Sequence, residues 1–104
     1  MNTATDRAAS NDVKAKPRLV FFHSPTSGRC RRLEAVLANI LRLRRNHEAF
    51  QVVRVDIRER PDLAERFRIE VVPTLLVIEG RRIVRRIISP KRAELERELA
   101  KWLV

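Results

Sequence analysis

The residues best suited to chemistry lie in one short segment at the start of a predicted helix. The segment reads Ser27-Gly28-Arg29-Cys30 and follows the apolar run Leu19–Phe22. Two cysteines at this spacing, between a buried strand and a helix, form the dithiol of thiol–disulfide exchange. Here the first position is a serine, and Cys30 is the only cysteine among 104 residues. The chain therefore has the layout of that chemistry without the reacting pair.

Cys30 has two interpretations, a reactive thiol or a packed core residue. The first turn of a helix and the arginines on both sides favour the thiolate, and His23 lies close enough in sequence to reach the turn. Cys30 also lies three residues before Leu33 and so extends the apolar face of the helix into the protein. Free cysteines often pack as small hydrophobic residues. The residues alone leave both interpretations open.

Other site chemistries have weaker support. Ser27 as a nucleophile needs a positioned base, and only His23 is near, so a role as helix N-cap explains it better. One cysteine and two histidines, His23 and His47, are too few and too scattered for a zinc site. Two glycines in the whole chain exclude a glycine-rich phosphate loop. We expect neither a metal nor a cofactor.

The length and composition indicate one small domain. Residues 1–17 are polar, without aromatic side chains, and are predicted to be a disordered tail, which leaves 18–104 as the domain. The tail has no apolar stretch typical of a secretory signal. The longest apolar runs fall well short of a membrane-spanning helix. With a single cysteine, these features favour a cytoplasmic protein that does not contact a membrane.

The chain is strongly basic, with a formal net charge of +10 and a pI near 11.4. Such a charge attracts nucleic acid or an acidic protein. Acidic residues are interleaved throughout, however, and aromatic platforms for stacking bases are scarce. An anionic partner is therefore a possibility that charge alone leaves open. The arginines cluster at Arg29, Arg31 and Arg32, at Arg42, Arg44 and Arg45, and at Arg81, Arg82, Arg85 and Arg86.

The hydrophobic pattern predicts the order βαβα in the first two thirds of the chain. Arg18–His23 is apolar on both faces, as in a central strand. From Gly28 the apolar period becomes helical, and the cations and asparagine at 44–46 favour an end there. Phe50–Ile57 is a second strand, and Pro61 begins a short helix.

The last third predicts a hairpin and a final helix, which completes the order βαβαββα. Val72 precedes a proline and must be extended. Thr74–Ile78 and Arg82–Ile88 are strands joined by a tight turn at Gly80, the second having the arginines of an edge strand. Ser89 and Pro90 are predicted as the N-cap and first residue of the final helix.

This order of elements, with Ser27-Gly28-Arg29-Cys30 opening the first helix and Val72-Pro73-Thr74 opening the third strand, resembles the thioredoxin family. The similarity covers about residues 18–104, and Gly80 and Pro61 fall where the family has its hairpin glycine and its proline-led helix. The resemblance implies an α/β fold with a four-stranded mixed sheet and helices on both faces. It also implies a cis peptide bond between Val72 and Pro73.

The departures from the family concern its reacting groups. By the resemblance, Ser27 replaces the attacking cysteine and Phe21 replaces the buried acid that handles protons. Thr26 replaces the tryptophan before the motif, and Arg29 replaces the proline within it. The glycine that shapes the substrate groove is replaced near 88–89. The core of the family is retained, and its chemical apparatus is lost.

These observations predict a partner-binding protein that has no dithiol–disulfide reductase activity. Its protein or peptide partner is expected at the face that holds Cys30 and Pro73, although Pro73 can equally serve only to start a strand. Two alternatives stay open: a single-cysteine redox role, by mixed disulfide or glutathionylation at Cys30, and a basic module for polyanions. The predicted binding residues are Thr26, Ser27, Gly28, Arg29, Val72, Pro73 and Thr74, with Cys30 as the candidate reactive atom.

Overall fold

The structure is a computed structural model that describes residues 16–43 and 49–103. Its strands and helices follow one another in the predicted order, βαβαββα, with one turn of 3-10 helix added at the end. In chain order the elements are β1 (Arg18–His23), α2 (Gly28–Leu43), β2 (Gln51–Asp56), α3 (Pro61–Arg66), β3 (Thr74–Glu79), β4 (Arg82–Ile88), α4 (Arg92–Leu99) and η1 (Ala100–Trp102).

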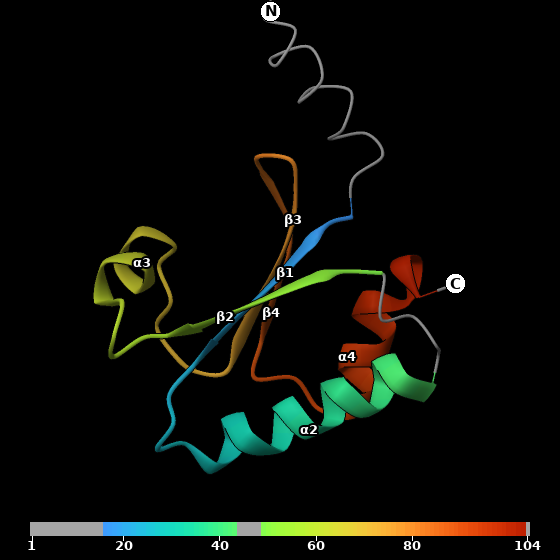
Figure 1. The fold of residues 1–104 in the computed structure, drawn as a ribbon, viewed down its shortest axis with the longest axis horizontal. Helices are drawn as coiled ribbons and strands as arrows, with labels where there is room; N and C mark the ends of the chain where they lie inside the picture. The colour runs from blue at the N-terminus through green and yellow to red at the C-terminus, as the bar shows by residue number, and fades with distance from the viewer. Residues whose placement is uncertain (1–15, 44–48, 104) are drawn as a thin grey trace, which may run out of the picture.

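The strands form a single mixed sheet in the order β2-β1-β3-β4 (Figure 1). β1 pairs in parallel with β2 and antiparallel with β3, and β3 and β4 form an antiparallel hairpin. β1 and β3 therefore lie inside the sheet, which explains why both are apolar on both faces. The four-stranded mixed sheet with helices on both faces is confirmed.

Alternate residues of β1 point into two separate cores. Leu19 and Phe21 pack with α2 and α4, whereas Val20 and Phe22 pack with the α3 side of the sheet. Figure 1 shows α2 and α4 lying side by side, with α3 well away from both. The two helices that carry the candidate site thus share one core, while α3 and the residues after it cover the other face.

α2 forms because its apolar residues repeat with the helical period. The buried positions on its length form one stripe, which faces the sheet and α4. The C-terminal end predicted for this helix, at 44–46, lies outside the described residues. The buried residues of α2 are Cys30, Leu33, Leu37, Ile40 and Leu41.

The predicted strand bounds hold to within one residue at each end. β2 is one residue shorter at each end than predicted, and β3 extends to Glu79. Gly80 has a φ of 62°, the left-handed geometry that glycine adopts without a steric cost and that this tight turn requires. A register shift at Val77/Ile78 makes β4 irregular, which accounts for the imperfect alternation of its sequence. β4 is an edge strand, as its arginines indicate.

The predicted start of the last helix is wrong. α4 begins at Arg92 with Lys91 as its N-cap, not at Ser89 and Pro90. Ser89 has a φ of 46°, outside the extended geometry of an N-cap residue, and its N–H donates to the carbonyl of Pro73 at 2.8 Å. This contact with a distant segment holds Ser89 in a bend, so the helix starts two residues later.

The predicted tail at residues 1–17 lies outside the described residues except for its last two. Of these, Pro17 is buried, and its carbonyl accepts a hydrogen bond of 2.9 Å from the N–H of Gln51.

None of the helices in the described ranges is long and apolar enough to cross a membrane.

Replacement of Leu99 by alanine tests the shared core of α2 and α4. Leu99 is fully buried in that core, so we expect Leu99→Ala to lower the free energy of unfolding by about 2–5 kcal/mol. Leu43→Ala is the matched control, because Leu43 is 64% exposed and should change stability by less than about 0.5 kcal/mol. Urea denaturation measures both; equal effects would contradict this description of the core.

Candidate functional site

The hydroxyl of Ser27 fixes the start of α2. Its Oγ accepts a hydrogen bond of 3.2 Å from the N–H of Cys30, and its carbonyl accepts one of 3.3 Å from the N–H of Arg31. The bond to Oγ satisfies one of the N–H groups that the first turn of a helix leaves without partners, and the bond to the carbonyl is the first hydrogen bond within α2. The preceding turn is held by Ser24, whose hydroxyl lies 3.0 Å from that of Thr26. The predicted N-cap role of Ser27 is confirmed.

Cys30 points into the protein. It is 3% exposed and belongs to the core shared by α2, α4 and the sheet. Ser27, three residues earlier, is half-buried at the surface of the same turn. The segment therefore presents a hydroxyl outward and its thiol inward. The geometry favours the packed interpretation of Cys30.

The second part of the candidate site is the segment before β3. The Val72–Pro73 peptide bond is cis, as predicted, and Pro73 is buried. The carbonyl of Pro73 is taken by the N–H of Ser89. The backbone N–H and carbonyl of Val72 make no hydrogen bond within the described part of the chain. Val72 thus offers free backbone groups beside Pro73.

Arg29 joins the two parts of the site. Its Nη1 donates a hydrogen bond of 3.3 Å to Oγ of Ser89, the residue that also holds Pro73. Arg29, Pro73 and Ser89 line one groove of about 280 Å³ between the start of α2 and the start of α4. We call it the α2–α4 groove. The groove therefore contains one residue from each of the two predicted segments, Arg29 and Pro73.

Four cationic side chains and an apolar floor line the α2–α4 groove. The remaining lining residue is Ser89, so no acidic residue takes part. The cations are Arg29, Arg32, Lys91 and Arg92, and the floor is Leu33, Val36, Pro73 and Pro90.

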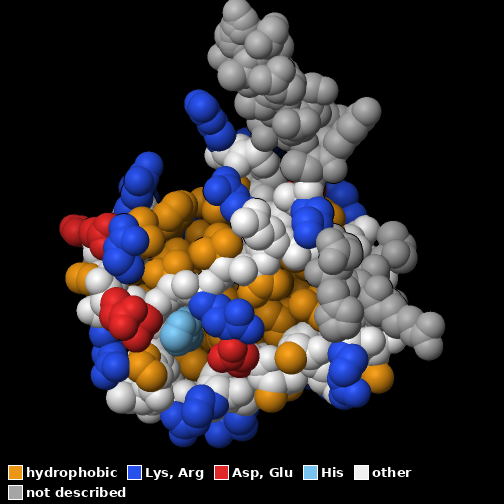
Figure 2. Space-filling model, in the orientation of Figure 1, with side chains coloured by type: hydrophobic (Ala, Val, Ile, Leu, Met, Phe, Trp, Pro, Cys, Tyr) orange, Lys and Arg blue, Asp and Glu red, His pale blue; other side chains and the backbone are white. Residues whose placement is uncertain are grey.

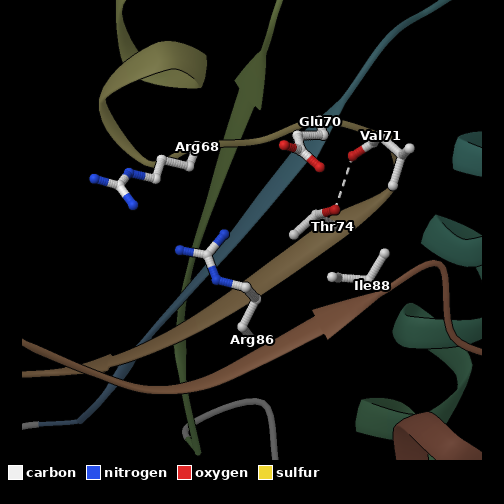
Figure 3. Close-up of a pocket in the computed structure, with 6 residues that line it drawn as sticks. All are labelled: Arg68, Glu70, Val71, Thr74, Arg86 and Ile88. Atoms are coloured by element: carbon white, nitrogen blue, oxygen red, sulfur yellow. Dashed lines mark hydrogen bonds between the residues drawn. The ribbon is translucent and has the colours of Figure 1, made fainter.

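A second hollow of about 510 Å³ lies between the loop that follows α3 and the residues of β3 and β4 that face it (Figure 3). Figure 3 shows Arg86 extending from β4 toward the loop that carries Arg68 and Glu70. The hydroxyl of Thr74 donates to the carbonyl of Val71 at 2.8 Å, which braces this loop. The hollow has an exposed apolar rim, with Val71 50% and Ile88 54% exposed. Predicted site residue Thr74 thus lies on this side, away from Arg29.

Several lining residues were not among the predicted site residues. Lys91 and Arg92 stand about sixty positions after Arg29 in the sequence, and only the packing of α4 against α2 brings them to the groove. Arg68, Arg86 and the exposed rim of the second hollow were also not predicted, because only the folded chain brings these residues together. Among the described residues, no group of three or more histidine, cysteine or carboxylate side chains could hold a metal ion.

The positive charge does not form one continuous field on the face that Figure 2 shows. Lysine and arginine side chains are scattered around that face, with apolar and acidic surface between them. Some of the arginines are also paired, as Arg54 is with Glu34 and Arg85 with Glu98. This distribution favours local contacts over general binding of a polyanion.

The comparisons with known proteins agree with this geometry. The sequence matches the Thioredoxin protein-family model over residues 1–102. It is also 34% identical over 98 residues to the thioredoxin of Mycobacterium bovis, covering 93% of this chain and 79% of that protein. The chain belongs to the thioredoxin family.

Other relatives and solved structures support the same placement. Thioredoxin H2 of Arabidopsis thaliana is 30% identical over 93 residues, covering 88% of this chain and 68% of that protein. The bifunctional thioredoxin reductase/thioredoxin of Mycobacterium leprae is 32% identical over 99 residues, which span 92% of this chain but about a fifth, 21%, of that relative. The crystal structure of thioredoxin NaTrxh from Nicotiana alata superposes with a TM-score of 0.75 at 25% identity, covering 96% of this chain and 84% of that one.

The core that holds Cys30 also contains Phe21, the residue at which the resemblance implies the loss of a buried acid. Phe21 is 1% exposed. Its ring lies 5.5 Å from that of His23. The interior near the thiol is therefore apolar at the point where the family places a proton-handling group.

Removal of the Ser27 hydroxyl tests the helix cap. We expect Ser27→Ala to lower the free energy of unfolding by about 1 kcal/mol, because the N–H of Cys30 loses its acceptor. Ser27→Asp, which keeps an acceptor at the positive end of the helix, should stay within about 0.5 kcal/mol of the wild type. Urea denaturation measures both variants. An alanine variant as stable as the wild type would show that the bond does not contribute.

Alkylation of the thiol tests the burial of Cys30. We expect iodoacetamide to react with the native protein about 100-fold more slowly than with the urea-unfolded protein, because reaction requires local opening. The matched control moves the cysteine to the exposed face of α2 in the double variant C30A/A35C, which should react at nearly the same rate folded and unfolded. Mass spectrometry measures both rates. Fast native alkylation of Cys30 would contradict its burial and favour a single-cysteine redox role.

Proposed function

We propose that this thioredoxin-family protein binds a partner peptide and does not carry out dithiol–disulfide exchange. The observation that carries the proposal is the position of its only cysteine, 3% exposed and packed in the core, with a serine at the outward position of the same turn. The binding face is formed by Thr26, Ser27, Gly28, Arg29, Val72, Pro73 and Thr74.

The chemistry of exchange supports the absence of reductase activity. Reduction of a disulfide begins with attack by a thiolate, and the mixed disulfide is then resolved by a second thiol. The hydroxyl of Ser27 does not ionise appreciably near neutral pH and acts as a helix cap. A mixed disulfide at Cys30 would find no second cysteine in the chain to resolve it. The chain therefore lacks both the outward attacking thiolate and the second, resolving thiol.

The free backbone of Val72 supports peptide binding. Because its N–H and carbonyl have no partner among the described residues, they can pair with the backbone of an extended segment. Pro73 cannot donate a hydrogen bond, and its carbonyl is already used by Ser89. The two hollows on either side of Pro73 provide space for the side chains of that segment.

A single-cysteine redox role has less support, because a thiol must be accessible to form a mixed disulfide or accept glutathione. Cys30 is enclosed by the apolar core itself. The protein is thus better suited to docking than to sulfur exchange.

A disulfide-reduction assay tests the proposed function. With dithiothreitol as reductant and insulin as substrate, we expect the wild type and Cys30→Ser to leave the uncatalysed rate unchanged. Ser27→Cys restores an outward thiol with Cys30 as its partner, and we expect it to raise the rate measurably. Turnover by the wild type that Cys30→Ser abolishes would defeat the proposal.

A further inference from the structure

The α2–α4 groove carries more positive charge than its neighbours neutralise. Arg92 has a carboxylate 3.7 Å away on Glu96 and donates to Oδ1 of Asn39 at 2.8 Å. Arg29 bonds only to a neutral hydroxyl. The side chains of Arg32 and Lys91 have no partner in the described part of the chain. About three positive charges therefore face the groove without a counter-charge.

The groove is not merely a basic surface, because its floor is apolar. Leu33 and Pro73 are buried beneath it, and Val36 is half-buried. A ligand that fits must place apolar atoms on the floor and negative charge at the rim. A strand of nucleic acid needs stacking platforms, and no aromatic side chain lines the groove. A peptide that carries both apolar and acidic side chains satisfies both conditions.

The groove also continues from the free backbone of Val72. Pro73, the next residue, is part of its floor, so a segment paired with Val72 would lie beside the groove. The opposite flank of Pro73 is less selective, since Glu70 offsets the arginines of that hollow. Charge complementarity therefore distinguishes the two sides of the binding face and assigns the acidic part of the ligand to the α2–α4 side.

We propose that the α2–α4 groove binds an acidic, extended peptide segment of a partner protein, with its carboxylates at Arg29, Arg32 and Lys91 and an apolar side chain on the floor. This inference rests on the proposed function and specifies the chemistry of its ligand.

The test measures binding of a fluorescein-labelled peptide of sequence Gly-Glu-Leu-Glu-Glu-Leu-Glu-Gly to the full chain by fluorescence anisotropy. We expect the analogue with glutamine in place of every glutamate to bind at least about 10-fold more weakly. Binding of the acidic peptide should also weaken as the salt concentration rises.

Paired variants separate the groove from the overall charge. R32Q/K91Q removes two groove cations and should weaken binding of the acidic peptide about 10-fold. R81Q/R82Q removes two positive charges from the exposed β3–β4 turn, at the far end of the sheet from the start of α2 (Figure 1), and should change binding by less than about 2-fold. Circular dichroism confirms that both variants are folded.

Three results would overturn the inference. These are no binding of the acidic peptide, equal binding of the glutamine analogue, and equal losses in the two paired variants, the last of which would indicate overall charge alone. Displacement of the peptide by a single-stranded oligothymidylate that is as sensitive to R32Q/K91Q would reassign the groove to nucleic acid. None of these results bears on reductase activity, so the insulin assay still judges the absence of dithiol–disulfide exchange separately.

Discussion

The hydrogen bond from the N–H of Cys30 to the hydroxyl of Ser27 is the contact on which the site depends. It sets where α2 begins, and the helical geometry then determines which way each residue of the first turn points. With the cap at Ser27, Cys30 joins the apolar stripe that continues through Leu33 and Leu37. This local interaction thus stabilises the helix start, and the packing of the apolar stripe makes the thiol inaccessible.

The loop between β4 and α4 connects this helix start to the rest of the face. Ser89 donates its N–H to Pro73 and receives a hydrogen bond from Arg29, so it touches both parts of the site. The bond from Ser89 fixes the segment before β3, and it leaves the backbone N–H and carbonyl of Val72 without a partner among the described residues. A surface with a free backbone edge and two flanking hollows is left where relatives in the thioredoxin family are expected to carry out exchange.

Local pattern was sufficient to predict the elements and their order, whereas the four-stranded mixed sheet was predicted from the resemblance. β1 and α2 are specified by burial on both faces and by helical period, both of which are properties of neighbouring residues. The start of α4 could not be predicted this way, because the φ of Ser89 accompanies a contact with Pro73, sixteen positions earlier in the sequence. Ser-Pro is a good helix start in isolation, and tertiary contact overrode that preference.

The sequence predicted the arginines near the start of α2 but not the cations that α4 adds to them. Ser27–Cys30 and Val72–Thr74 were predicted as one face because the resemblance places them together. The cations of α4 join Arg29 and Arg32 only once two helices have packed against each other. A charge cluster assembled across such a distance leaves no signal in a single sequence.

The inward thiol has a consequence for how the face responds to its surroundings. A surface whose only nearby sulfur lies beneath apolar side chains offers oxidants in the solvent nothing to modify. Its shape and charge therefore stay the same as the ambient redox potential rises and falls. Under the proposed function, this face would recognise the same ligand under oxidising and reducing conditions alike.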